Sequence, residues 1–369
     1  MKKNLLYICE VQYPSSSAYA IHVAKMCEAF VKNKFTVSLI TPNSTSTRKR
    51  LKKIYNLNES INIKSIFKSK VNLNFITKII YSIKIIFLLN NSKNKNFVIS
   101  RAVIPSIILS LFRYKSVLEI HHDISGLTRL LFIICNHLKL LKNISYIFLN
   151  KSLIKNFIIN NNNKYICLDD AISLKDFKIK KKHKIEKKTC VYIGSFYPGK
   201  GFDIIMKLAD KCKSIKFHLY GDKTFINNKN FKRKNVKFLG YIPYFKIPYI
   251  LSKYKIALMP YEKKIFGRGQ IDISKSISPL KMFDYMASKK IIIASDLKIY
   301  RHILKNKYNS ILIKPDSIIQ WKENIEKIFK NPKKYKNISI NAYSDVKKYT
   351  WDERVKKIKK NSYLINIFK

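Results

Sequence analysis

The chain has 369 residues, of which 47% are hydrophobic, so it is long enough for two domains with buried cores. Its formal net charge is +52, from 74 basic and 22 acidic residues, which brings nucleic acid and anionic membrane surfaces into consideration as partners. Lysine far outnumbers arginine, and asparagine and isoleucine are also abundant, so we attribute most of the charge to a bias in residue usage. A nucleic-acid-binding protein stays a weak alternative, because no known nucleic-acid-binding module accompanies the charge.

The six cysteines exclude two further classes. They are scattered and contain no C-x-x-C pair, which argues against a structural zinc site and a disulfide framework and fits a reducing compartment. They stand at Cys9, Cys27, Cys135, Cys167, Cys190 and Cys212. The N-terminal apolar run ends early, at Glu10, so we interpret it as a strand and not as a signal peptide.

The most hydrophobic window, Ile76–Leu89, is interrupted by Lys78 and Lys84. It is shorter than the ~20 apolar residues that span a bilayer, so it predicts an amphipathic helix. Two interpretations remain open, a helix at a membrane interface and a helix that faces the core. Polar residues in place of Ile79, Ile83 and Ile86 should abolish vesicle binding in the first case and unfold the domain in the second.

The first half of the chain alternates short apolar strands with helices. The turn after the first strand holds Ser15–Ser17 and no glycine, which argues against a nicotinamide cofactor there. The strand Val117–Ile120 ends in His121, His122 and Asp123, where polar side chains of a parallel sheet meet ligands. The expected strands are Leu5–Val11, Val37–Thr41, Phe97–Ser100, Val117–Ile120 and Tyr146–Leu149, and the expected helices are Tyr19–Lys32, Leu127–Leu141 and Lys151–Asn160.

The second half repeats this alternation after a lysine-rich stretch, residues 175–187, which we interpret as a linker. The loop Tyr261–Ile277 is long for a compact α/β unit, and loops of that length commonly have a function. The expected strands are Cys190–Gly194, Phe217–Gly221, Val236–Gly240, Lys255–Pro260 and Ile291–Ser295, and the expected helices are Phe202–Lys213, Tyr244–Ser252 and Trp351–Lys369.

The segment Ser278–Ala287 has the clearest chemical pattern. Ser278 suits the N-cap of a helix and Pro279 its first position. The segment lies between two buried strands, which places the helix N-terminus at the carboxyl edge of a parallel sheet and makes it an anion site. Lys281 adds a full positive charge there, and Asp284 adds a carboxylate one turn further along. Phosphate at the cap and two hydroxyls at the acid would suit a nucleotide.

These motifs resemble the retaining family 4 glycosyltransferases, which have the GT-B fold. The segment Ser278–Ala287, followed by Ile291–Asp296, is similar to their donor-site helix, and Tyr192–Gly201 is similar to their glycine turn. Tyr349–Trp351 resembles the aromatic signature before their final crossover helix. The resemblance implies an α/β protein with two Rossmann-like domains whose parallel sheets face a central cleft. The expected domains are residues 1–174 with 352–369 for the acceptor, and 188–351 for the nucleotide sugar.

The resemblance also implies the site residues. His121 is the candidate for the histidine that lies beside the transferred sugar, and His122 is the alternative. The competing interpretation is a histidine with a structural role only. The implied donor-binding residues are Gly194, Ser195, Lys200, Gly221, Ser278, Leu280, Lys281 and Asp284. No Asp-x-Asp motif occurs, so we expect no metal and no cofactor, and the nucleotide-diphosphate sugar is a substrate.

Two departures from the family concern the catalytic detail. Ser276 stands where members usually have the first of two glutamates, with Asp284 at the second, and Ser195 stands where many have arginine. The expected activity is hexosyl transfer to a glycan or lipid-linked acceptor in bacterial surface polysaccharide biosynthesis, in the cytoplasm at the inner membrane face. The alternatives are a nucleotide-sugar 2-epimerase of the same fold and a weakened enzyme that only binds nucleotide sugar.

Overall fold

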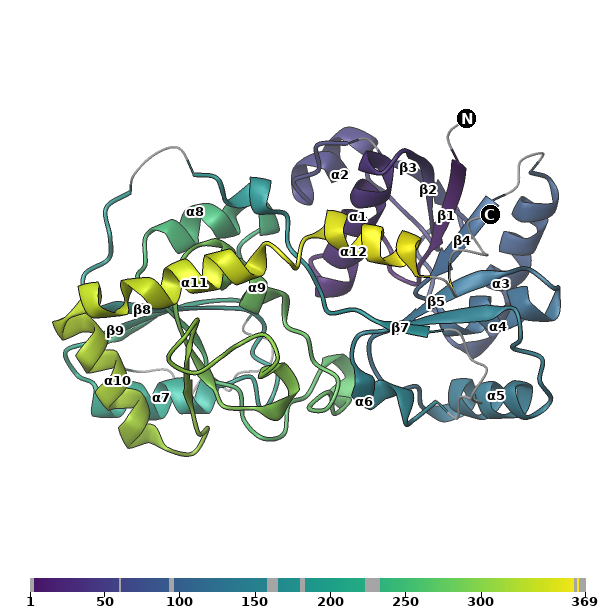
Figure 1. Ribbon diagram of the computed structural model, residues 1–369. Coiled ribbons are helices and arrows are strands. Elements are labelled where there is room, and N and C mark those ends of the chain that lie inside the picture. The colour runs from purple at the N-terminus through teal and green to yellow at the C-terminus, as the bar shows by residue number, and fades with distance from the viewer. Residues whose placement is uncertain are drawn as a thin grey trace. The chain divides into compact units, whose positions relative to one another are not determined.

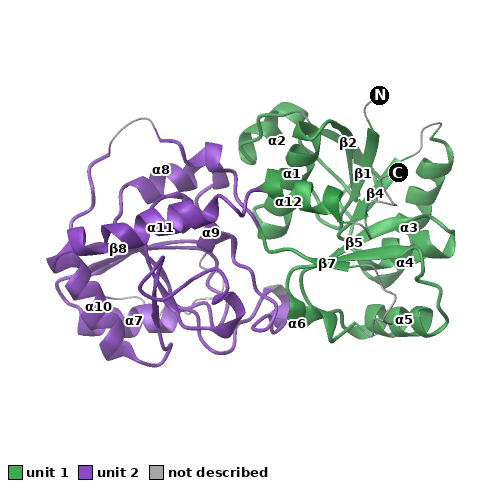
Figure 2. Cartoon of the chain, in the orientation of Figure 1, with its two compact units in different colours: residues 1–170, 351–369 green, residues 171–350 purple. Residues whose placement is uncertain are grey.

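The computed structural model describes residues 3–59, 61–92, 96–157, 165–179, 183–222, 233–361 and 364. The chain divides into two compact units, the first made of residues 1–170 and 351–369 and the second of residues 171–350 (Figure 2). The boundary after residue 170 therefore lies four residues before the expected domain boundary at residue 174. The described part of the expected linker, residues 175–187, lies within the second unit. Among the helices described, none combines the length and the apolar character that crossing a bilayer requires.

The first unit is built on a sheet of seven parallel strands in the order β3-β2-β1-β4-β5-β6-β7 (Figure 1). The order reverses at β1 and β4, so this edge is the topological switch point at which ligands of such sheets bind. The strands are β1 (Lys3–Ile8), β2 (Phe35–Thr41), β3 (Asn62–Ser65), β4 (Asn96–Ser100), β5 (Ser116–Ile120), β6 (Ile144–Phe148) and β7 (Tyr165–Cys167).

Helices cover both faces of this sheet. Leu6 pairs with Val98, Ser100 with Leu118, and Leu118 with Tyr146, so these residues share one face, and α3, α4 and α5 pack on it. The other face carries Tyr7 and Glu119, and α1 and α12 lie against each other there (Figure 1). The helices are α1 (Ala18–Lys32), α2 (Arg48–Ile54), α3 (Phe75–Asn90), α4 (Val103–Leu111), α5 (Gly126–His137), α6 (Lys151–Ile154) and α12 (Trp351–Lys360).

The second unit is built on six parallel strands in the order β10-β9-β8-β11-β12-β13. Its largest core lies between one face of the sheet and the helices α7 and α10, and includes the fully buried Trp321. The strands are β8 (Thr189–Ile193), β9 (Lys216–Tyr220), β10 (Val236–Phe238), β11 (Ile256–Met259), β12 (Ile291–Ser295) and β13 (Ile311–Ile313). The helices are α7 (Phe202–Lys211), α8 (Ile247–Ser252), α9 (Leu280–Ala287), α10 (Ile318–Lys330) and α11 (Lys336–Val346).

The α/β class and the two parallel sheets agree with the prediction. The sequence interpretation missed α2, β3, α4, β7, β13, α10 and α11. Helix α4 was missed because its residues are apolar on nearly every side and packed between neighbours, so no helical period stands out. The helix expected at 151–160 ends at Ile154, and residues 158–160 lie outside the described part. The final helix is described as Trp351–Lys360, and residues 362–363 and 365–369 of the expected one lie outside it.

Candidate functional site

The glycine turn after β8 is held by contacts that only glycine allows. Gly199 and Gly201 have φ values of 77° and 94°, in the left-handed region. A Cβ at Gly201 would stand 2.1 Å from the carbonyl oxygen of Pro260, so β11 packs directly on the turn. The long loop after β11 is fixed in the same way, since Glu262 N donates to Gly199 O at 2.9 Å and Phe266 N donates to Pro198 O at 3.0 Å. The loop of residues 261–277 is therefore part of the wall of this turn.

Two further glycines make room for a lysine. A Cβ at Gly194 would stand 2.5 Å from Lys281 Nζ, and a Cβ at Gly221 would stand 2.0 Å from Gly194 O. Gly194 N donates to Tyr220 O at 2.9 Å, which anchors the turn to the end of β9. The structure thus brings together Gly194, Gly221 and Lys281, three of the residues that the family resemblance assigned to donor binding.

Helix α9 begins one residue later than predicted. Pro279 has ψ of 121°, outside the helical range, so Pro279 occupies the N-cap position and Leu280 is the first helical residue. Ser278 is buried but lies before the cap, and its expected role as the capping side chain is wrong. The Pro279 side chain makes no capping hydrogen bond, and the positive end of the α9 dipole lies at Leu280 and Lys281, beside the glycine turn.

The Lys281 ammonium is the most unusual group of this site. Nζ is shielded from solvent and has no hydrogen-bond partner among the described residues, and it lies 3.7 Å from the ring centroid of Tyr192. Burial, and then repulsion from Lys200, holds the pKa of Lys281 well below its usual range, against the opposing effect of Asp284. Lys200 donates to Ser195 Oγ at 3.0 Å, and burial lowers its pKa to about 8. Two amines therefore lie close together without an anion between them.

Asp284 lies one turn further along α9 and is 4% exposed. Its Oδ1 has no hydrogen-bond partner in the part of the chain described. Burial, followed by repulsion from Asp176, raises the pKa of Asp284 well above its usual range. Buried polar atoms are rarely left unpaired, so an unpaired cation and an unpaired carboxyl oxygen on one helical turn indicate a ligand with matching groups. Ser276, by contrast, is buried, and its Oγ lies 3.5 Å from Ile273 O.

In the first unit, His121 follows the carboxyl end of β5. Its Nε2 lies 2.8 Å from Glu119 Oε1, which fixes the ring. Burial, and then the positive charge of Arg101, lowers the pKa of His121 to about 3, so the ring is neutral at physiological pH. When Nε2 carries the proton and donates it to Glu119, Nδ1 is left as an acceptor. His122, the alternative, is exposed, and its Nδ1 lies 2.9 Å from Asp123 O.

Glu119 lies at the centre of a buried network that the sequence interpretation missed. Tyr7 OH donates to Glu119 Oε2 at 2.7 Å, His22 Nε2 lies 2.9 Å from Oε1, and Arg354 from α12 pairs with the same oxygen. Burial alone would raise the pKa of Glu119, but the neighbouring His22 and Arg354 hold it well below its usual range. The one sequence signal was a carboxylate inside an otherwise apolar strand, which requires a buried partner.

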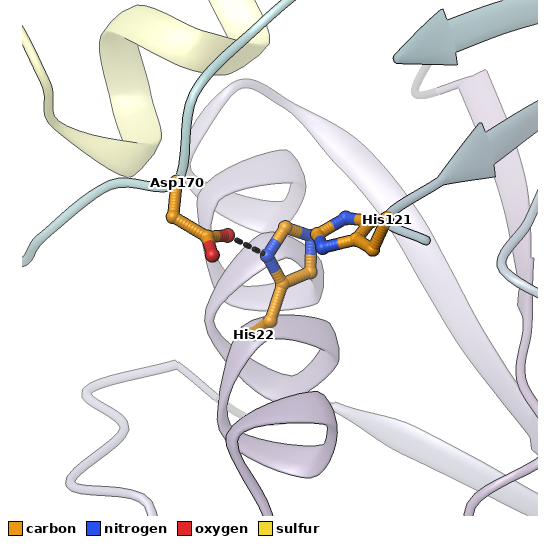
Figure 3. A group of neighbouring side chains, drawn as sticks. All are labelled: His22, His121 and Asp170. Carbon is orange, nitrogen blue, oxygen red and sulfur yellow. Dashed lines mark hydrogen bonds and ion pairs between the residues drawn. The ribbon is translucent and has the colours of Figure 1, made fainter. Parts of the chain in front are cut away.

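His22, His121 and Asp170 come close enough together to suggest a metal site (Figure 3). One ligand atom from each lies within 4.8 Å of the others. His22 Nδ1, however, bonds Asp170 Oδ1 at 2.6 Å, and His121 Nε2 is engaged by Glu119. The guanidinium of Arg354 on the same carboxylate adds a positive charge beside the cluster. We therefore interpret these residues as a hydrogen-bonded network and assign no metal to them.

Part of the chain matches known proteins in sequence. Residues 175–345 match the family model described as "Glycosyl transferases group 1". A curated protein from Methanocaldococcus jannaschii, named an uncharacterized glycosyltransferase, is 25% identical over 177 residues, which is 46% of this chain and 46% of that protein. The matched part therefore spans about half the length of that relative.

Solved structures match over nearly the whole chain. A glycosyltransferase from Rickettsia africae has a TM-score of 0.75 at 13% identity and covers 100% of this chain and 99% of its own. The Staphylococcus aureus protein TarM has a TM-score of 0.72 at 14% identity, with coverage of 100% and 99%. HepE from Anabaena, solved in complex with UDP and glucose, has a TM-score of 0.67 at 12% identity, with coverage of 97% and 99%. At these identities the likeness establishes the fold.

Proposed function

We propose that the protein is a glycosyltransferase that uses a nucleotide-diphosphate sugar, because residues 175–345 match the glycosyl transferases group 1 model and the chain has the GT-B fold. The sugar passes, with retention of its anomeric configuration, to a glycan or lipid-linked acceptor in the synthesis of a bacterial surface polysaccharide. The reaction takes place in the cytoplasm at the inner membrane face. The observation that carries the proposal is the pair of unpaired buried groups on α9, Lys281 Nζ and Asp284 Oδ1.

The two amines and the N-terminus of α9 are suited to a diphosphate leaving group. Lys281 and Lys200 each lose part of their affinity for a proton in the ligand-free protein, because burial removes their hydration. A diphosphate would return the missing counter-charge and restore that affinity. Negative charge that develops as the bond from the sugar to the diphosphate breaks would be stabilised by groups already in position. No metal is needed for this neutralisation.

Asp284 is suited to the ribose of the donor. An ionised carboxylate accepts hydrogen bonds from two neighbouring hydroxyls, and a ribose carries two on one edge. The position one turn after Lys281 separates the nucleoside contact from the phosphate contact along α9. Two structural neighbours were solved with a nucleotide of this class, HepE with UDP and glucose and a TarM mutant with UDP.

We propose that His121 contacts the transferred sugar. Its ring is held by Glu119 and is neutral, so Nδ1 can accept a hydrogen bond from a sugar hydroxyl. In this role Glu119 is a positioning residue, because it acts on the sugar only through His121. Retention and the role of His121 rest on the family resemblance.

The test is a screen of UDP, GDP, ADP and their sugar conjugates for thermal stabilisation and for release of nucleoside diphosphate. One nucleotide series should stabilise the protein. Lys281→Ala should weaken the binding of the corresponding nucleoside diphosphate by roughly 1–3 kcal/mol, the value of a charge-assisted hydrogen bond. Asp284→Asn should weaken nucleoside binding more than pyrophosphate binding. Unchanged affinity in both folded variants would exclude this site. Binding without turnover would favour the alternative of a weakened enzyme, and conversion of the free nucleotide sugar would favour the epimerase.

A further inference from the structure

Helix α3 is apolar on both of its sides. Its inner side supplies Tyr81, Ile85 and Leu89 to the core of the first unit. Its outer side carries four large apolar residues at successive turns, and a helix on a water-exposed surface ordinarily has polar residues there. These are Ile76, Ile80, Ile83 and Phe87, with exposed fractions of 66%, 41%, 42% and 63%.

Helix α5 repeats this arrangement. Phe132 and Cys135 face the core, whereas the outer side exposes Leu127 (61%), Leu130 (56%) and Ile134 (47%). Helix α4 is packed between α3 and α5, and all three cover the same face of the seven-stranded sheet (Figure 1). The outer sides of α3 and α5 therefore form one surface of the first unit, which we call the α3–α5 face. Exposed apolar surface of this extent usually marks an interaction site.

The charge around the α3–α5 face is mostly positive, although Glu10 pairs with Lys78 of α3 at 2.8 Å. Residues 60–168, which contain both helices, hold 16 basic and 2 acidic residues, against 74 and 22 in the whole chain. One of the two acids, Glu119, is buried on the opposite face of the sheet. The exposed basic residues near the two helices are Lys84, Arg113, Lys115, Arg129, Lys139 and Lys142.

We propose that the α3–α5 face docks on a bilayer surface that contains anionic lipid. Apolar side chains of α3 and α5 would enter the boundary between headgroups and acyl chains, and the surrounding lysines and arginines would contact the negative headgroups. A second copy of this chain is the less favourable occupant, because it would bring one basic rim against another. Nucleic acid would match the charge but would leave the apolar side chains without a partner. The inference rests on the proposed function in one respect: access to a lipid-linked acceptor would give the protein a reason to have such a surface.

The position of the apolar residues corrects the sequence-based choice of substitutions. Ile86 is 5% exposed and belongs to the core, so replacing Ile79, Ile83 and Ile86 together would mix a structural effect with a surface effect. Residues whose side chains are at least half exposed avoid this, because substitutions at such positions rarely change stability by much. Ile76 and Phe87 serve on α3, and Leu127 and Leu130 on α5.

The experiment is flotation of the full chain with vesicles of phosphatidylcholine alone or with about 30% phosphatidylglycerol, at about 0.15 M salt. The protein should float with the anionic vesicles and much less with the neutral ones. The pairs Ile76→Gln with Phe87→Gln and Leu127→Gln with Leu130→Gln should each lower the vesicle-bound to free ratio at least tenfold. The control pair Ile319→Gln with Ile340→Gln removes exposed apolar side chains from α10 and α11 of the second unit and should leave it unchanged.

Binding of nucleoside diphosphate and the thermal midpoint are measured on the same variants. Both should match the unsubstituted chain, because the nucleotide site lies in the second unit, so loss of vesicle binding and loss of the donor site are separate results. Equal flotation of all variants, or no flotation of the unsubstituted chain, would overturn the proposal. A dimer that the α3 and α5 pairs convert to monomer, with no binding to anionic vesicles, would assign the face to self-association instead.

Discussion

Lys200→Met should make the ligand-free protein more stable while it impairs nucleotide binding. Burial lowers the pKa of Lys200 from 10.5 to about 8. At about 1.4 kcal/mol per pH unit, the folded state loses ~3 kcal/mol at neutral pH by keeping this amine charged. Methionine has similar length and no charge. The local losses are the hydrogen bond to Ser195 Oγ and the contact of Nζ with the Tyr197 ring at 4.9 Å, which together are worth roughly 1–1.5 kcal/mol. We therefore expect a net gain of about 2 kcal/mol in the free energy of unfolding, or a rise of roughly 4–8 °C in the unfolding midpoint.

The pH dependence follows from the direction of the shift. Above pH 8 the folded protein releases the Lys200 proton, whereas the unfolded chain keeps it up to about pH 10.5. The stability of the unsubstituted protein therefore rises with pH in this interval as far as Lys200 contributes, and the advantage of Lys200→Met shrinks. In the same interval the affinity for nucleoside diphosphate should fall, because the free protein must take up a proton to bind the anion.

Lys290 provides a matched control. Burial also lowers its pKa to about 8, and its Nζ donates to Tyr254 O at 2.7 Å. Lys290 stands before the first residue of β12, at the amino end of the strand, whereas the proposed ligand lies at the carboxyl ends. Urea denaturation measures the stability of both variants. Calorimetric titration with nucleoside diphosphate should show that Lys290→Met keeps full affinity and that Lys200→Met loses affinity tenfold or more. The reasoning is refuted if Lys200→Met lowers stability at pH 7, or if both variants lose affinity equally.

Two further substitutions test the two units separately. Glu119→Gln should lower the free energy of unfolding by about 3–5 kcal/mol at pH 7, since it leaves the Arg354 guanidinium without its buried counter-charge. Because folding lowers the pKa of Glu119, the unsubstituted protein loses this advantage as the pH falls through the acid range. Acid titration of both proteins by circular dichroism would show whether their stabilities converge. Gly194→Ala would place a methyl group 2.5 Å from Lys281 Nζ and should weaken the binding of nucleoside diphosphate at least tenfold. The control Gly269→Ala tests backbone strain alone, because Gly269 has φ of 72° and nothing within 4 Å of an added Cβ. Equal calorimetric affinities for the two alanine variants would contradict the role of Gly194.

The α9 part of the candidate donor site could be predicted from the sequence because its residues are local. Lys281 and Asp284 lie on one helix between two short strands, and parallel topology then places the helix start at the ligand edge. The error of one residue at Ser278 arose because a serine before a proline looks like a cap, whereas the backbone of Pro279 places the cap at the proline itself. Burial of Lys281 against Tyr192 could not be predicted, since it depends on packing between β8 and α9.

The network around Glu119 could not be predicted for a different reason. Its members are far apart in the sequence, with 148 positions between His22 and Asp170 and 235 between Glu119 and Arg354. Each residue alone looks ordinary, since His22 stands within a helix and Arg354 within a charged helix. The α3 window was ambiguous because isoleucine fills both sides of the helix, and a hydrophobic period cannot separate an inner from an outer apolar side when both are present.

The path of the chain through the two units bears on how the protein is made. The second unit is one continuous segment, residues 171–350, and it is synthesised completely before the segment that carries Arg354. Glu119 and Arg354 are separated by 235 positions, so at about 5–20 residues per second the ribosome adds Arg354 roughly 10–50 s after Glu119. During that time the carboxylate lacks its guanidinium partner, and the first unit cannot close over it at low cost. The first unit should therefore complete its fold only after the second unit has been synthesised, although most of its residues come earlier in the sequence.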